Sequence, residues 1–397
     1  MRRILISGML ILFLFACKDE TINHISLPDG AVPIVYCGYI YIHGSVDSVN
    51  GNFLLDTGAE NLHLDSIFYI DNNFAYENYQ NGKINGIGNS FQEAIAIMDT
   101  VNFQYNNHSY ESSFVLVHNL KIIGGDFIDG IIGLNFFSKK ILEVNFLRQF
   151  INVHNSIDSV DISGYSMIPI EIIDDRMCVP LKIKANGKVT VEGNFMIDVG
   201  STLSTMTSSI AEKFNFNENI DRKVAYYTKY GGIGGDSYGY DLIADSIFIS
   251  DFSLCNVNMS YSIDTSGLMA SEDFFGILGN NILERFDVIF DFDNNNLYLK
   301  PNAEFISPYV FDRLGFSYVD RSKTMGGWIV TGLSKGSPAE KQGLQIDDKI
   351  ISVNKISVEK ISFKTQNDFF KQLDKVEFII NRSGNLIKIK FKLFPLL

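Results

Sequence analysis

Two apolar segments of this chain share one pattern and end in the same way. Residues 51–58 read Gly-Asn-Phe-Leu-Leu-Asp-Thr-Gly, and residues 193–200 read Gly-Asn-Phe-Met-Ile-Asp-Val-Gly. The short apolar run predicts a buried strand in each segment, and the Asp-x-Gly after it predicts a tight turn. A carboxylate at the end of a buried strand is costly unless it is paired or used. The pattern therefore indicates that Asp56 and Asp198 belong to one site, assembled from two copies of a fold.

The similarity continues beyond these segments, as an internal duplication requires. A Gly-Ile-Gly triplet follows each Asp, an apolar-apolar-Gly element closes each unit, and a cysteine precedes each Asp. The matching residues, with their distances from Asp56 and Asp198, are Gly88 and Gly234 (32 and 36 residues), Gly133 and Gly279 (77 and 81 residues), and Cys37 and Cys178 (19 and 20 residues). Landmarks in the same order at nearly constant spacing predict two homologous domains.

This combination of motifs resembles the aspartic peptidases, and the short units resemble two retropepsins fused in tandem. The resemblance covers roughly residues 31–302. It implies a mainly β fold in which two β-barrel lobes, residues 31–165 and 166–302, form one cleft. The 32 Phe and 18 Tyr residues agree with strands rather than helices. The implied activity is that of an aspartic endopeptidase acting on a peptide or protein substrate.

The resemblance also implies the chemistry of the paired carboxylates, Asp56 and Asp198. Two carboxyls that share one proton hold a water between them, one acting as base and the other as acid, with no cofactor and no covalent intermediate. The glycines after them would allow a tight turn, and a serine hydroxyl would bond a carboxylate oxygen. These expected supporting residues are Thr57, Gly58, Gly200 and Ser201. The simpler alternative is that each Asp merely caps a β-turn.

One position departs from the family pattern. Val199 stands where the family usually has Thr or Ser, whose hydroxyl reaches across to the opposite loop. Val has nearly the shape of Thr but no donor, so half of that bridge is expected to be missing while Thr57 serves the other half. The loss of such a hydrogen bond costs about 0.5–1.5 kcal/mol, which predicts a loosened site. Val199 is also the best support for a second hypothesis, a peptide-binding lipoprotein that keeps the peptidase fold without cutting.

The Gly-Ile-Gly triplets stand where the family has flaps, which are mobile hairpins that close over the substrate and bond its backbone. The expected flap residues are Gly86, Ile87, Gly88, Gly232, Ile233 and Gly234. The alternative is a plain Gly-rich hairpin, because Gly marks tight turns regardless of function.

The sequence pattern changes near residue 303. Gly336-Ser337-Pro338-Ala339, followed by Asp347-Asp348-Lys349-Ile350, resembles a bacterial PDZ domain, here residues 303–397. The resemblance implies a separate β-sandwich module with one or two helices, one of them over residues 367–373 as a wall of a peptide groove. The alternative is a module kept only for packing against the lobes.

The PDZ resemblance also implies a binding loop. Leu314, Gly315 and Phe316 are the residues whose amides would bind a peptide C-terminus, with the peptide added as a strand beside them. A peptide C-terminus in this groove is therefore a possible partner, for recruitment of substrate or for regulation.

The first residues are typical of a secretory signal peptide. Two arginines precede an apolar stretch over residues 4–15, which is too short to span a bilayer. Leu14-Phe15-Ala16-Cys17 resembles a bacterial lipobox, which predicts a signal peptide over residues 1–16, lipid on Cys17 and a polar tether over residues 17–30. We expect an outer-membrane lipoprotein that faces the periplasm or the cell surface. An ordinary secretory signal is the alternative.

Composition excludes other classes of function. The formal net charge is −13, and no basic run interleaved with aromatic residues occurs, so nucleic acid is not an expected partner. The six His are scattered and no CxxC or HExxH motif occurs, so no metal site is expected. We expect Cys37 and Cys178 to be buried thiols, although sequence alone leaves a disulfide open.

Overall fold

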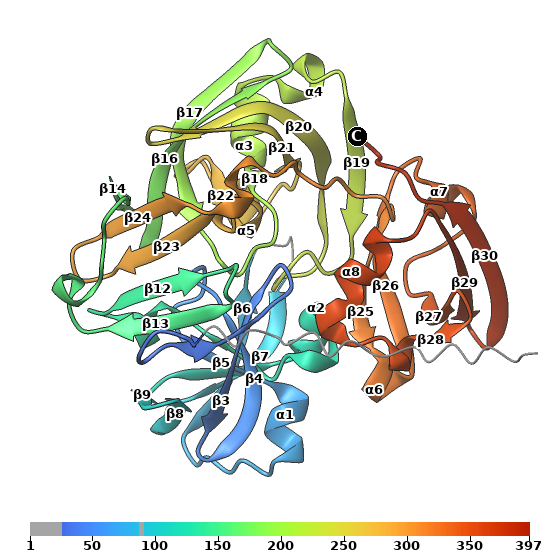
Figure 1. Ribbon diagram of the computed structural model, residues 1–397. Helices are drawn as coiled ribbons and strands as arrows, with labels where there is room; N and C mark the ends of the chain where they lie inside the picture. Colours follow the sequence, from blue (N-terminus) through green and yellow to red (C-terminus); the bar gives the residue numbers. More distant parts are fainter. Residues whose placement is uncertain (1–25, 87–90) are drawn as a thin grey trace, which may run out of the picture.

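The computed structural model describes residues 26–86 and 91–397 of the 397-residue chain. The predicted signal peptide, Cys17, Ile87 and Gly88 therefore lie outside the described residues. The protein is mainly β, as predicted. Figure 1 shows the first lobe in blue to green, the second lobe beside it in green to light orange, and the C-terminal domain in darker orange to red against both.

The first lobe is one curled sheet with short helices. The strands, in their order across the sheet, are β6 (Tyr79–Asn85), β7 (Phe91–Ile97), β10 (Val115–His118), β5 (Leu62–Asp65), β11 (Gly130–Ile132), β4 (Val49–Leu55), β3 (Ile40–Val46), β8 (Val101–Tyr105) and β9 (His108–Ser112), with β2 (Val35–Tyr36) paired to β3. The helices are α1 (Ser66–Asp71) and α2 (Lys121–Gly124).

The second lobe repeats this arrangement. Its strands, in order, are β15 (Glu171–Ile173), β16 (Arg176–Ala185), β17 (Val189–Ile197), β22 (Gly276–Leu278), β18 (Thr205–Met206), β21 (Phe252–Ser262), β20 (Ser237–Ile249) and β19 (Lys223–Thr228). Its helices are α3 (Ser208–Lys213), α4 (Phe216–Asn219) and α5 (Asn280–Leu283).

Strand register confirms the duplication at the centre of each lobe. The closing elements pair in parallel with the strands that carry the Asp residues, so that Ile131 lies opposite Leu54 and Ile277 lies opposite Met196. The backbone N–H of the following Asp then donates to the end of the closing strand in both lobes, Asp56 to Ile132 at 3.1 Å and Asp198 to Leu278 at 3.0 Å.

The cysteine landmark of the repeat was wrong. Cys178 lies opposite Met196, two residues before its Asp, whereas Tyr41 holds the corresponding place opposite Leu54 in the first lobe. Cys37 instead precedes β3 and is only half-buried, although Cys178 is buried as expected. Among the described residues, neither of these cysteines nor the exposed Cys255 forms a disulfide. Similar spacing from an Asp was not sufficient to establish structural equivalence.

A shared sheet joins the two lobes. Its order is β1 (Val32–Pro33), β13 (Phe150–His154), β12 (Ile141–Asn145), β23 (Phe286–Asp291), β24 (Asn296–Pro301) and β14 (Ser166–Pro169). The central antiparallel pair takes one strand from each lobe, with Val144 opposite Val288. One continuous apolar core therefore includes buried residues of both lobes.

The C-terminal domain has its own core, with Trp328 at its centre. Its strands are β25 (Phe316–Arg321), β26 (Gly327–Ser334), β27 (Lys349–Val353), β28 (Ile356–Ser357), β29 (Lys375–Arg382) and β30 (Asn385–Lys392), and its helices are α6 (Ser322–Met325), α7 (Pro338–Lys341) and α8 (Gln366–Lys371). The groove helix predicted over residues 367–373 corresponds to α8.

The sequence predicts a separate module here, but the structure joins this domain to the second lobe through a shared sheet. Strand β26 pairs with β19 of the second lobe, so the sheet of that lobe continues into the C-terminal domain. Backbone bonds from Lys335 to Ala225 (2.7 Å) and from Lys229 to Thr331 (2.8 Å) extend the ladder at both ends. Figure 1 shows β19 and β26 side by side.

The first lobe holds the C-terminal domain through a second contact. Arg321 Nε donates to Asp126 Oδ1 at 3.0 Å, and the backbone N–H groups of Lys323 and Thr324 both donate to Asp126 Oδ2 at 2.9 Å. Beside this cluster the ring of Phe363 stacks on Phe127. The C-terminal domain is thus tied to both lobes.

Among the described residues, no helix is long and apolar enough to cross a membrane.

We predict that Asp126→Ala destabilises the protein by about 3 kcal/mol, because it leaves the buried Arg321 guanidinium without its partner. Hydrogen exchange at the amides of Lys323 and Thr324 should accelerate, and urea unfolding gives the stability. Glu192→Ala is the control, because its ion pair with Lys182 is exposed and its loss should change stability by less than about 1 kcal/mol. Equal effects of the two substitutions would contradict the prediction.

Candidate active site

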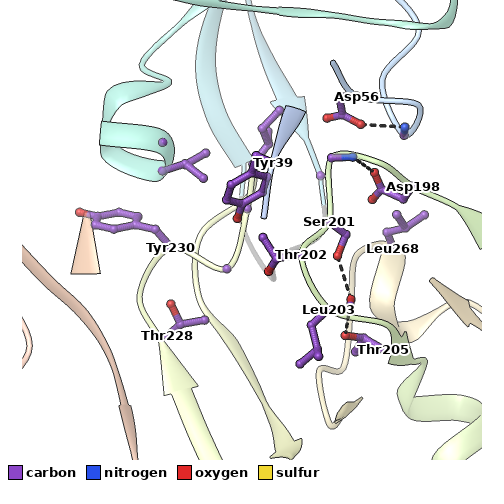
Figure 2. A pocket seen from close by; sticks show the side chains of 18 of the residues that line it. Tyr39, Asp56, Asp198, Ser201, Thr202, Leu203, Thr205, Thr228, Tyr230 and Leu268 are labelled. Carbon is purple, nitrogen blue, oxygen red and sulfur yellow. Dashed lines mark hydrogen bonds between the residues drawn. The ribbon is translucent and has the colours of Figure 1, made fainter. Parts of the chain in front are cut away.

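The two predicted carboxylates lie at the ends of β4 and β17, each cradled by the turn that follows it. Gly58 N donates to Asp56 Oδ1 at 2.7 Å, and Gly200 N donates to Asp198 Oδ1 at 2.8 Å. Ala59 N adds a bond to Asp56 Oδ1 at 3.2 Å. Figure 2 shows the two side chains on neighbouring loops from different lobes.

Each carboxyl packs against the glycine of the opposite loop. A Cβ added to Gly200 would lie 2.4 Å from Asp56 Cγ, and one added to Gly58 would lie 3.2 Å from Asp198 Cγ. Neither glycine has a positive φ, so the tight turn expected from the sequence is not what requires glycine here. The reason is the close approach of the second carboxyl.

This arrangement favours one proton shared by the pair. Burial raises the pKa of both carboxyls, and the neighbouring charge of Asp56 raises the pKa of Asp198 further. Two carboxylates in one buried site cannot both ionise easily, so one proton stays on the pair well above the usual range of Asp.

Thr57 links the two loops in the way the sequence predicts. Its hydroxyl donates to the carbonyl of Ile197 at 2.9 Å and accepts from the backbone N–H of Val199 at 3.0 Å. The Val199 side chain is fully buried and has no hydroxyl to make the reciprocal pair of bonds. The bridge between the lobes is therefore one-sided.

Asn280 adds a second link that the sequence analysis missed. Its side-chain amide donates to the carbonyl of Val199 and to the carbonyl of Gly38 in the first lobe, both at 2.8 Å. The only signal in the sequence was a polar residue after Gly279, where the first unit has Leu134 after Gly133. This amide partly replaces the bridge that Val199 lacks.

The expected role of Ser201 was wrong. Its hydroxyl donates to the carbonyl of Leu203 at 2.9 Å and not to a carboxylate oxygen (Figure 2). In the first lobe, the backbone N–H of Ala59 supplies a bond to its carboxylate instead. Ser201 therefore shapes its own loop.

A cavity of about 1400 Å³ opens over the two carboxyls. Both lobes and strands β25 and β26 of the C-terminal domain line it, together with the half-buried Tyr39, whose side chain interacts with Thr202 close to the pair. Sequence reasoning missed both of these polar residues, since neither belongs to a repeated motif. The volume fits a peptide segment.

The predicted flap residues that the structure describes meet above this cavity. The hairpin of β6 and β7 brings Gly86 so close to the other hairpin that an added Cβ would lie 2.1 Å from the carbonyl oxygen of Ile233. The hairpin of β19 and β20 is closed by a bond from Gly231 N to Gly235 O at 2.9 Å. Gly232 lines the cavity with Ile233, and Gly234, with φ 104°, needs glycine for its left-handed backbone.

A second cavity, of about 770 Å³, is lined by β25 and α8 of the C-terminal domain. Tyr39 and Tyr41 of the first lobe also line it, and both tyrosines line the larger cavity as well. The predicted peptide groove therefore shares a wall with the cavity over the carboxyls.

The predicted loop for a peptide C-terminus is already occupied. Leu314 N donates to Asp312 Oδ1 at 2.8 Å, and Gly315 N donates to Asp312 Oδ2 at 3.0 Å. Phe316 begins β25 and pairs with Leu333. The chain's own carboxylate thus takes the place expected for a peptide carboxylate, which corrects the role predicted for this loop.

Two family models match parts of this chain. Residues 179–282 match the family model of an aspartyl protease, and residues 309–380 match that of the PDZ domain. Among solved structures, an aspartic proteinase from Irpex lacteus is similar with a TM-score of 0.45 and 16% identity, covering 70% of this chain and 98% of that chain. No curated protein matches the sequence. The protein thus combines an aspartyl protease-like domain with a C-terminal PDZ domain.

We predict that Val199→Thr stabilises the protein by about 1 kcal/mol, because the new hydroxyl completes the reciprocal bridge between the loops. Urea unfolding measures the change. The matched substitution Thr57→Val removes both hydrogen bonds of the Thr57 hydroxyl. It leaves the carbonyl of Ile197 and the N–H of Val199 without this partner, so it should lower stability by about 1–3 kcal/mol. A Thr at position 199 that destabilises the protein would show that the bridge cannot form.

We predict that the PDZ groove binds a peptide with an aliphatic C-terminal residue equally well as the free acid and as the amide. Asp312→Ala should free the amides of Leu314 and Gly315 and favour the free acid by about tenfold, since charge-assisted bonds are worth about 1.5–3 kcal/mol. Calorimetric titration of both peptides measures this. Asp374→Ala is the control. The carboxylate of Asp374 is exposed and lies 4.0 Å from Arg313, so its removal should leave the ratio of the two affinities unchanged. If the wild type prefers the free acid, Asp312 does not block the amides of Leu314 and Gly315, and the prediction is wrong.

Proposed function

We propose that this protein is an aspartic endopeptidase that cleaves peptide bonds with a water held between Asp56 and Asp198. The observation that carries the proposal is the packing of each carboxyl against the glycine of the opposite loop. This packing, with the raised pKa values of both groups, supports one shared proton. A dyad in this state supplies a base and an acid at once.

In the proposed mechanism the ionised carboxyl takes a proton from the water, and the water oxygen attacks the peptide carbonyl carbon. The protonated carboxyl donates to the carbonyl oxygen, so a neutral tetrahedral diol forms. Its collapse breaks the C–N bond, while the proton returns through the dyad to the leaving nitrogen. The hairpins that carry Gly86 and Ile233 would cover the bound peptide and exclude water.

The PDZ domain is proposed to recognise a peptide segment or to regulate access. Its groove shares Tyr39 and Tyr41 with the cavity, so a segment bound there would lie next to the cleft. We further propose anchoring through lipid on Cys17, which would hold the protein on the outer membrane, facing the periplasm or the cell surface.

A peptide-binding protein without catalysis is the second candidate. The one-sided bridge at Val199 favours it, because a looser pair of loops positions the carboxyls less firmly. Digestion of a peptide library separates the two candidates, since cleavage products appear only with a peptidase.

We predict that Asp56→Asn and Asp198→Asn each abolish cleavage, because either change removes the exchange of a proton within the pair. For the wild type, kcat/KM should decline as pH rises. The raised pKa values hold one proton above the usual range of Asp, and activity is lost when that proton leaves and both carboxyls ionise.

Asp245→Asn serves as the control, since its carboxylate bonds Gly187 outside the cavity. This variant should retain wild-type turnover with the same pH profile. Turnover that survives in either dyad variant would exclude the proposed mechanism.

A further inference from the structure

His63 is a polar residue in an apolar wall of the active-site cavity. It lies on β5 between Leu62 and Leu64, whose side chains belong to the core of the lobe. Because side chains alternate along a strand, His63 faces the other side of the sheet, and it lines the cavity. Its cross-strand neighbour Ile131 lines the same cavity.

A chain of hydrogen bonds sets which nitrogen of His63 carries the hydrogen. Gln92 Nε2 donates to the carbonyl of Asn119 at 2.8 Å, so the other end of this amide, Oε1, is the atom 3.1 Å from His118 Nδ1. That oxygen only accepts, so His118 Nδ1 must donate, which leaves His118 Nε2 as an acceptor in the neutral ring.

The same reasoning applies one step further. His63 Nδ1 lies 2.9 Å from His118 Nε2 and must therefore be the donor. His63 Nε2 is left with a lone pair and no hydrogen. Within the described part of the chain, no hydrogen-bond partner for this nitrogen is found.

Both rings are neutral. Burial lowers the pKa of His63 to about 3, with His118 adding to the shift, and burial lowers the pKa of His118 to about 4. His63 therefore offers an uncharged hydrogen-bond acceptor to whatever enters this part of the cavity.

The surrounding wall defines the body of a suitable ligand. The cavity residues near His63 in the sheet and the adjoining cluster are Leu54, Leu120, Ile128 and Ile131. These four residues offer no counter-charge to an ammonium or guanidinium group, and Glu60, the cavity carboxylate nearest to His63 in the sequence, is exposed to solvent. An aromatic side chain with a hydrogen-bond donor at its tip, that is Tyr or Trp, satisfies both the wall and the acceptor.

The second lobe provides an internal comparison. Thr205 lies opposite Ile277 just as His63 lies opposite Ile131, so the two residues are structurally equivalent. Thr205 Oγ1, however, is bonded to Ser260 Oγ at 2.7 Å. Thr205 thus already has its partner within the lobe, whereas among the described residues no partner is found for Nε2 of His63, which lines the cavity.

We propose that His63 makes the first-lobe side of the cavity a recognition subsite for a Tyr or Trp side chain of the peptide. This inference rests on the proposed function and specifies its substrate class. His63 would contact the substrate side chain, while Gln92 and His118 act as positioning residues that hold the tautomer.

The kinetic experiment uses pairs of peptides that differ only in Tyr against Phe, with the exchange moved through each substrate position in turn. At one position, kcat/KM of the wild type should favour Tyr by about tenfold. His63→Phe, which keeps a ring but removes the acceptor, should bring this ratio to about one. The control Thr205→Val should leave the ratio unchanged. A wild type without Tyr preference at any position, or a preference that survives His63→Phe, overturns the proposal.

A second measurement needs no variant and no turnover. Nitrogen-15 NMR of the wild type should show His63 with a protonated Nδ1 and an unprotonated Nε2, and the reverse assignment overturns the proposal. Binding of the same peptide pairs to the Asp198→Asn variant should show the same preference. If the wild type cleaves no peptide, the proposed function fails, but a Tyr preference in binding still supports the subsite, and equal affinities overturn it.

Discussion

The approach of two carboxyls from different lobes, the half-buried Asp56 and the buried Asp198, is the constraint on which the remaining structure depends. Each carboxyl occupies the space that a side chain on the opposite glycine would fill, so both loops must match each other closely. Their mutual repulsion must also be overcome, and one shared proton achieves this more cheaply than two buried charges. The ladder of β12 and β23 and the bonds of Thr57 and Asn280 hold the lobes in register against that repulsion.

Duplication supplies a symmetric backbone, but the side chains at equivalent positions are not symmetric. Thr57 bridges the loops where Val199 does not, and Asn280 supplies a cross-lobe amide where the first unit has Leu134. In the second lobe, the Asn280 amide thus supplies part of the link between the loops that Val199 cannot make. Symmetry of the fold sets where the two carboxyls lie, whereas the asymmetric side chains set how firmly each is held.

The features that sequence could predict are those encoded locally. Asp56 and Asp198 stand in short, nearly identical segments, and the mainly β fold and the PDZ domain are implied by the family resemblances that such motifs carry. The hydrogen-bond partners of the Ser201 hydroxyl and the Asp312 carboxylate could not be predicted from sequence. Each group had several partners within reach, and only the folded loop selects one. Gly200 was expected for its turn, but it is needed because Asp56 approaches from a strand far away in sequence.

Fusion of the PDZ sheet to the second lobe makes the two hairpins over the cavity unequal. Strand β6 of the first hairpin lies at the edge of its sheet and pairs only with β7 among the described strands. Strand β19 of the second hairpin lies between β20 and β26, so its displacement breaks a ladder on each side. Since every broken ladder bond exposes a donor and an acceptor, the second hairpin is the more costly one to move. The C-terminal domain therefore contributes to the site by holding the second hairpin in place.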